Sequence, residues 1–166
     1  MIYKYTLLLI FIIFSSNLVF AQNKNIDKLF SKYSNTNGFS SVQLKDPGKT
    51  LPNMTKRNQK EIKELLDGVE HIKVLSMEDD KVQKPTSDQF REEVMNLQPG
   101  EGFKEIFSVK DGGNALKMHI KDNNGSVSDL LMLVSEEKKV TLIWFNGKLD
   151  LEKLTKSASM LPNILK

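Results

Sequence analysis

The sequence predicts an α+β domain with a mixed, mostly antiparallel sheet, a C-terminal four-strand meander and helices packed on one face. The first observation is the alternation of apolar and polar side chains over residues 115–121, which is typical of a half-buried strand. The second is the pair of turn sequences at residues 111–114 and 122–125, because Asn-Gly between apolar runs is a strong hairpin signal. The third is the helical spacing of apolar side chains over residues 25–34.

The first 21 residues indicate a secretory signal peptide. Lys4 precedes an almost unbroken apolar run over residues 6–20, and small side chains suit cleavage after Ala21. An uncleaved membrane anchor is the alternative, but the run is short for a span of about 20 residues. No cysteine lies at the cleavage point, so we expect no lipoprotein anchor and no stable membrane anchor after cleavage. We therefore expect an exported protein, periplasmic or secreted, with one α+β domain over residues 22–166.

The domain is expected to begin with a helix over residues 25–34, with Asn25 as its N-cap. Its apolar stripe consists of Ile26, Leu29, Phe30 and Tyr33. A short strand with Val42 and Leu44 on one face follows, and a second helix is expected over residues 58–67.

The next strand is expected over residues 70–77. Its period of two places Ile72 inward, and His71 and Lys73 outward. A polar linker over residues 78–85 then leads to the third helix.

The third helix is expected to open with a capping box formed by Thr86 and Gln89. Its apolar stripe consists of Phe90, Val94 and Leu97. The meander begins after it, and the first strand is predicted to hold Phe103, Phe107 and Val109 in one register.

Residues 130–134 and 140–145 are apolar in both registers, which predicts central strands buried on both faces. Trp144 and Phe145 belong to a set of apolar side chains larger than one helix layer covers. Ordinary core packing is one explanation, and a sheet face that meets a lipid or a partner protein is the alternative. A final helix is expected from Asp150. Its apolar side consists of Leu151, Leu154, Ala158 and Leu161.

Charge and cysteine content exclude several functions. The full chain carries a formal net charge of +3, and removal of the signal peptide takes away one lysine, which leaves +2. A nearly neutral protein with mixed charges gives no case for nucleic-acid binding. The chain has no cysteine, so neither disulfides nor thiolate chemistry are available to it.

Five segments of the chain resemble, in the same order, those of an exported bacterial family of unknown function, numbered 4252 (DUF4252) and found mostly in Bacteroidetes. They are residues 33–35, 39–42, 72–76, 109–114 and 142–150. The resemblance covers nearly the whole mature chain, and it implies a short envelope or secreted protein without an established activity. It supplies no catalytic or binding residues, because the matching positions are those of strands and turns.

His71 and His119 are the only histidines, and each falls on the polar register of its strand. A metal site needs three or four ligands, so we predict no metal site. We also predict no cofactor and no catalytic residue, because the sequence shows no constellation of residues typical of either. The sheet face around the histidines is a candidate ligand or partner surface, although solvated side chains would show the same pattern. This candidate surface consists of His71, Lys73, Lys117, His119 and Lys121.

A locally basic loop before the second helix is the other candidate. It would attract phosphorylated lipid headgroups or an acidic glycan, and a plain solvated loop is the alternative. This candidate anion-binding loop consists of Lys45, Lys49, Lys56, Arg57 and Lys60.

We therefore expect an exported, non-catalytic binding or interaction module of the bacterial envelope. Its partner would be an envelope protein, lipid or glycan, and not a nucleic acid. The alternative is an envelope-stress or sigma-factor-linked regulatory protein, which rests on compartment and family analogy alone. A hydrolase is less favoured, because no serine stands in a strand–turn–helix elbow and neither histidine has a carboxylate at a suggestive spacing.

Overall fold

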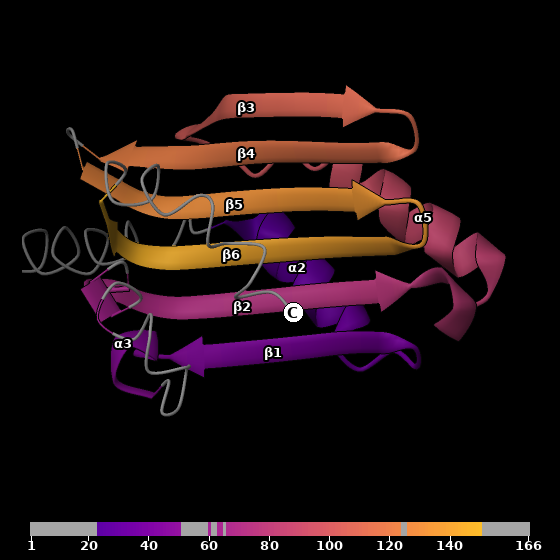
Figure 1. Cartoon of the computed structure of the whole chain (residues 1–166), viewed down its shortest axis with the longest axis horizontal. Helices are drawn as coiled ribbons and strands as arrows, with labels where there is room; N and C mark the ends of the chain where they lie inside the picture. The colour runs from indigo at the N-terminus through magenta and orange to yellow at the C-terminus, as the bar shows by residue number, and fades with distance from the viewer. Residues whose placement is uncertain (1–22, 51–59, 61–62, 65, 124–125, 151–166) are drawn as a thin grey trace, which may run out of the picture.

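The computed structural model (Figure 1) describes residues 23–50, 60, 63, 64, 66–123 and 126–150 of the 166-residue chain. Six strands form one sheet in the order β1-β2-β6-β5-β4-β3, and each neighbouring pair is antiparallel. The strands are β1 (Phe39–Lys45), β2 (Val69–Glu78), β3 (Phe103–Asp111), β4 (Asn114–Asn123), β5 (Ser126–Glu136) and β6 (Lys139–Leu149). The predicted α+β class and the C-terminal four-strand meander are confirmed.

Two helices, α2 (Lys24–Tyr33) and α5 (Lys84–Met95), lie on the same side of the sheet, behind it in Figure 1. Two short helical segments, α3 (Pro47–Thr50) and η2 (Asp79–Lys81), adjoin the ends of β1 and β2. The prediction that helices pack on one face is confirmed for α2 and α5. We call the face under these two helices the first face and the opposite one the second face.

The first face carries an apolar core. All four side chains of the stripe predicted for α2 are buried, and α5 buries Phe90 and Val94 against the same cluster. The rings of Tyr33 and Phe39 each lie within 4.9 Å of the Phe90 ring, centroid to centroid. Burial of such side chains stabilises the fold by about 1.5–3 kcal/mol each, which explains why an amphipathic helix packs here.

The second face is apolar too, because β5 and β6 are buried in both registers and lie centrally in the sheet, as predicted. One row of paired residues crosses this face through all six strands. This second-face row consists of Val42, Val74, Ile143, Met132, Met118 and Phe107. The neighbouring first-face row consists of Ser41, Leu75, Leu142, Leu133, Lys117 and Ser108.

A bulge in β3 changes which of its side chains share a face. The register against β4 shifts between Glu105 and Phe107, so that Ile106 is the extra residue. Phe103 therefore packs against the first-face cluster, whereas Phe107 and Val109 pair with second-face residues of β4. The prediction of a single register for these three side chains is wrong, because the alternation of a strand reverses at a bulge.

Both long helices begin earlier than the sequence predicts. The N-cap of α2 is Asn23, whereas the side-chain amide of Asn25 donates to the carbonyl of Gln98 at 2.8 Å. Helix α5 begins at Lys84, with a proline in its first turn and no side-chain cap. The capping box predicted from Thr86 is therefore wrong. Proline suits the first turn because its missing N–H needs no partner there.

Several predicted segments lie outside the described residues. The signal peptide and the helix predicted after Asp150 do so, and the helix predicted over residues 58–67 does so in large part, although residues 60, 63 and 64 are helical. Within the described part of the chain, no helix has the length and apolar character needed to cross a bilayer.

Candidate functional site

The structure splits the candidate surface predicted around the two histidines. His71 and Lys73 lie on β2, whereas Lys117, His119 and Lys121 lie on β4. Strands β6 and β5 separate the two groups, which at about 4.8 Å per strand are about 14 Å apart. Pairing places all five on the first face, which carries the helices and is not an open face. They therefore do not form one site.

His119 is buried, with only 9% of its surface exposed, so its prediction as a solvated side chain is wrong. The end of α5 lies over β4 here, because Nζ of Lys117 donates to the carbonyl of Met95 at 2.8 Å. Burial lowers the pKa of His119, against the opposing effect of the Glu105 carboxylate 3.6 Å from its Nε2. Its Nδ1 atom is buried without a protein partner. A neutral, packed imidazole fits these surroundings.

The other group surrounds the buried carboxylate of Asp129, which is 3% exposed. Its Oδ1 accepts from Nε1 of Trp144 at 2.8 Å, Nδ2 of Asn146 at 2.9 Å and Nδ2 of Asn23 at 3.4 Å. Its Oδ2 accepts from the hydroxyl of Ser128 at 2.9 Å. These bonds fix the indole and the start of α2 relative to the sheet, because each buried group left unsatisfied costs about 1–3 kcal/mol.

Lys73 joins α2 to the sheet beside this carboxylate. Its Nζ lies 3.0 Å from Oδ1 of Asp27, 4.8 Å from the centroid of the Trp144 ring and 5.7 Å from that of Phe30. The ammonium thus combines an ion pair with two cation–π contacts. It also lies over the face of the indole, which keeps that face from stacking on a ligand while Lys73 stays in place.

A cavity of about 330 Å³ lies between the start of α2 and strands β1, β2 and β6. Its lining residues are Asn23, Asp27, Gln43, Glu70, His71, Lys73, Trp144 and Asn146. They supply hydrogen-bond donors and acceptors but no hydroxyl or thiol nucleophile. Among the described residues, no cluster of three or more His, Cys, Asp or Glu side chains is placed to hold a metal ion. These side chains could hydrogen-bond a polar molecule in the cavity.

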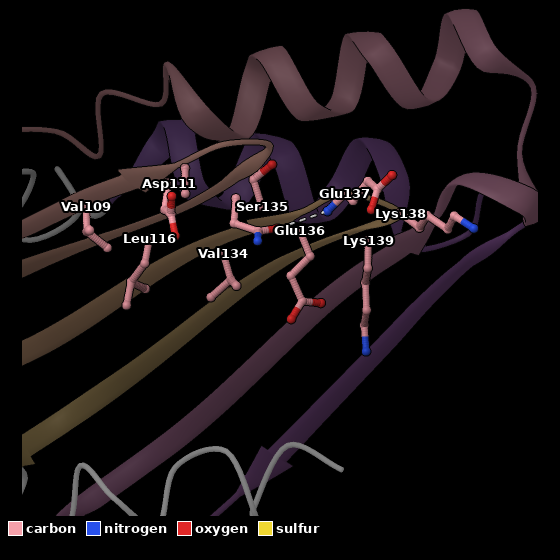
Figure 2. Close-up of a pocket in the computed structure, with 11 residues that line it drawn as sticks. Val109, Asp111, Leu116, Val134, Ser135, Glu136, Glu137, Lys138 and Lys139 are labelled. Carbon is pink, nitrogen blue, oxygen red and sulfur yellow. Dashed lines mark hydrogen bonds between the residues drawn. The ribbon is translucent and has the colours of Figure 1, made fainter.

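A second, larger hollow of about 540 Å³ lies on the second face at the turn ends of the two hairpins. Figure 2 shows Val109, Leu116 and Val134 pointing away from the helices into this hollow. The two hairpin turns are tied together, because the backbone N–H of Glu137 donates to Oδ1 of Asn114 at 3.2 Å. Apolar and charged side chains therefore line the hollow together, between two turns that are joined by this hydrogen bond.

Exposed apolar side chains gather on the edges of the sheet. In the described part of the chain, four large hydrophobic side chains are exposed: Val42 at 46%, Ile106 at 48%, Phe107 at 47% and Val109 at 47%. Val42 belongs to the edge strand β1, and the other three belong to the opposite edge strand β3. Val109 also lines the hollow of Figure 2, so the exposed strip of β3 and the hollow are continuous.

The predicted anion-binding loop is only partly described. Lys45 and Lys49 are exposed, and Nζ of Lys60 lies 4.0 Å from a carboxylate oxygen of Glu64. The remaining two members, Lys56 and Arg57, lie outside the described residues. The described lysines form no enclosed anion site.

Sequence reasoning missed the hydrogen-bond centre at Asp129. The available signal was the position of Asp129 directly before the run over residues 130–134 that is apolar in both registers. A carboxylate that is buried there must accept hydrogen bonds from nearby donors. The partners themselves came from β6 and from the start of α2, and nothing in the sequence pairs them with Asp129.

The fold and these sites define a small α+β domain with an all-antiparallel six-stranded sheet, a cavity lined by polar side chains at one end of the first face and exposed apolar side chains on the second. The chain belongs to the family described as Domain of unknown function (DUF4252), which it matches over residues 33–157. No curated protein and no solved structure matches it significantly.

Proposed function

We propose that the protein is an exported, non-catalytic binding module of the bacterial envelope, and that it binds a partner protein along β3. The observation that carries the proposal is the exposed apolar strip of β3, which consists of Ile106, Phe107 and Val109. Export is inferred from the signal peptide predicted for residues 1–21, and the choice of surface is supported by the exposure of these three side chains. Exposed apolar groups rimmed by polar residues are typical of interaction sites.

The position of β3 at the sheet edge supports a protein partner. Its outer backbone N–H and C=O groups face no other strand of the described sheet. An extended peptide can add to such an edge, where backbone hydrogen bonds supply affinity and pockets for alternate side chains supply specificity. The hollow beside Val109 is such a pocket.

The bulge limits where a partner strand can pair. Strand β3 carries two lysines, Lys104 and Lys110, and a bulge at Ile106 that interrupts its register. The charges and the bulge both restrain uncontrolled pairing at this edge. Residues 107–111 lie beyond the bulge, where the register is regular. We place the partner segment along these residues, with an apolar side chain in the hollow.

The charges around the hollow favour a protein over a lipid surface. Asp111, Glu136 and Glu137 line it together with Lys138 and Lys139. Three carboxylates repel an anionic headgroup layer, whereas a peptide with both signs of charge can complement this rim.

The test is site-specific photo-crosslinking in the native host. Benzoylphenylalanine replaces Phe107 in one variant and Ser108 in a matched control, because both positions are exposed but point to opposite faces. We expect one protein to be captured strongly from position 107 and weakly from position 108. Equal capture from both positions, capture of lipid alone from position 107, or no capture from either would contradict the proposal.

A further inference from the structure

The edge strand β3 has one side whose backbone groups are free to pair. In Figure 1 it is the outermost strand at the top of the sheet, and no other described strand or helix lies beyond it. Its hairpin with β4 closes over two glycines, with Asp111 opposite Asn114. The closing pair of such a two-residue hairpin exchanges hydrogen bonds, and this exchange alternates along the strand. The backbone N–H and C=O groups of Ser108 and Lys110 therefore point outward, where a further strand would pair.

The bulge decides which residues of β3 occupy consecutive positions of the ladder. The register against β4 shifts at Ile106, so this residue takes up no position of its own. In order, the ladder positions around Ser108 are therefore filled by Lys104, Glu105, Phe107, Ser108, Val109, Lys110 and Asp111. Each charge on one side of Ser108 thus has the opposite charge at the same distance on the other side, and the two apolar residues flank Ser108 directly.

We propose that two copies of the protein pair along β3, antiparallel, about a twofold axis at Ser108. The partner is then a second copy of this chain, and the inference rests on the proposed function. Phe107 lies opposite Val109 of the second copy, and both belong to the second face. An aromatic side chain opposite a β-branched one is a favourable cross-strand pair. Because Val109 lines the hollow of Figure 2, the ring of Phe107 from the second copy can cover the apolar wall of that hollow.

The charged side chains of the two copies match in the same register. Lys110 lies opposite Glu105 of the second copy on the first face, and all four charged positions of β3 are exposed. Lys104 lies opposite Asp111 of the second copy on the second face. The twofold axis repeats both pairs. Opposite charges directly across an antiparallel ladder stabilise it, whereas like charges destabilise it.

The neighbouring registers match less well. A twofold axis at Val109 would place Phe107 opposite Asp111. An axis at Phe107 would place Val109 opposite Lys104. Either shift sets an apolar side chain against a charge and separates the pairs of opposite charge. The order of side chains along β3 therefore favours the axis at Ser108.

Sedimentation velocity of the mature chain measures this pairing. The interface uses one strand from each copy and is small, so we expect a dimer that dissociates in about the micromolar range. Lys104→Asp and Asp111→Lys each turn two attractive pairs into two repulsive ones and should each weaken dimerisation about tenfold. The variant with both changes restores opposite charges in exchanged positions and should dimerise like the parent. Lys28→Asp, an exposed reversal on α2, is the matched control and should leave dimerisation unchanged.

Isotope-filtered NMR checks the register of the pairing. In a mixture of carbon-13-labelled and unlabelled protein, contacts between copies should join the Phe107 ring to the Val109 methyl groups. The methyl groups of Val42, on the opposite edge strand, should show none.

A chain that stays monomeric up to about 1 mM would overturn the inference. A dimer whose affinity ignores both charge reversals would overturn it as well, because another surface would then hold the copies together. Capture of a different protein from position 107, together with a monomeric chain, would remove the second copy as partner and leave the proposed function standing. Failure of both dimerisation and capture would remove both.

Discussion

The two faces of the sheet differ in how their apolar rows end. The first-face row is apolar at its centre and ends in Ser41 and Ser108 on the two edge strands. The second-face row is apolar throughout and ends in Val42 and Phe107, both nearly half exposed. In this first-face row the apolar side chains are confined to the three strands β2, β6 and β5. On the second face they continue to both edges, past the buried centre.

This difference separates apolar residues that core packing explains from those that it does not. An apolar residue under a helix is explained by core packing, whereas an exposed one at a sheet edge lowers solubility and is typical of an interaction site. The first face holds the apolar cluster under α2 and α5 and the polar groups that anchor α2, and the centre of the second face holds a second buried cluster. The edges of the second face, above all β3, carry the apolar surface that core packing does not explain.

The largest effect is expected from substitutions at the buried centres of the two faces, which test whether both centres are equally well packed. Leu142 and Ile143 are neighbours on opposite faces, and both are 0% exposed. Leu142→Ala and Ile143→Ala should each lower the free energy of unfolding by about 2–5 kcal/mol in urea denaturation. Val42→Ala, at an exposed edge position, is the control and should change it little.

The next effect concerns the buried carboxylate that anchors α2. Asp129→Ala removes the acceptor for Trp144, Asn146 and Asn23, and should lower the free energy of unfolding by about 2–3 kcal/mol. The emission of Trp144, the only tryptophan, should shift to the red as its surroundings loosen. Asp129→Asn keeps one carbonyl acceptor and should cost less. An alanine variant as stable as the parent would contradict this role.

A smaller effect is expected at Lys73. Lys73→Met removes the ion pair with Asp27 and the cation–π contact with Trp144 but keeps an apolar stem. Asp27 is nearly half exposed, so solvent screens the pair, and the loss should be about 0.5–1 kcal/mol. Asp27→Asn should lose part of this free energy of unfolding. High salt should narrow the difference in stability between the parent and both variants. Losses above those of Asp129→Ala would contradict this order.

The smallest effect is the pH dependence that His119 contributes. Burial lowers its folded-state pKa below the usual value of 6.5, while Glu105 raises it and Lys117 lowers it. The unfolded chain therefore binds more protons as the pH falls below 6.5, so stability falls there and levels off below the folded-state pKa. His119→Gln should flatten this part of the curve in denaturation between pH 8 and pH 5. An unchanged curve would contradict the burial of a neutral imidazole.

Much of the fold followed from local patterns. The period of two in β4, the turn before it and the doubly apolar β5 and β6 identified the meander, because each pattern reports the surroundings of its own strand. The stripe of α2 was equally readable. The starts of the two helices were not readable, because Asn23, the N-cap of α2, is held by distant Asp129, and α5 begins at Lys84 with a proline in its first turn and no side-chain cap.

The candidate site was harder to predict, because its surroundings also depend on contacts between segments that are far apart in the sequence. His119 alternates with apolar residues as a solvated side chain would, yet it is 9% exposed beside Lys117, which contacts the end of α5. The split between His71 and His119 follows from the strand order, which places β6 and β5 between β2 and β4. The exposed strip of β3 depends on a bulge at Ile106 that alternation alone does not indicate.

The most direct test of the difference between the faces is the affinity of the purified protein for the partner captured from position 107. Val109→Lys changes the open edge of the second face, and Asp27→Asn changes an exposed polar group of the first face. Titration calorimetry should show affinity at least about tenfold weaker for Val109→Lys, a loss of about 1.4 kcal/mol, and unchanged for Asp27→Asn. Full affinity in Val109→Lys, together with a loss in Asp27→Asn, would assign binding to the first face and contradict the account.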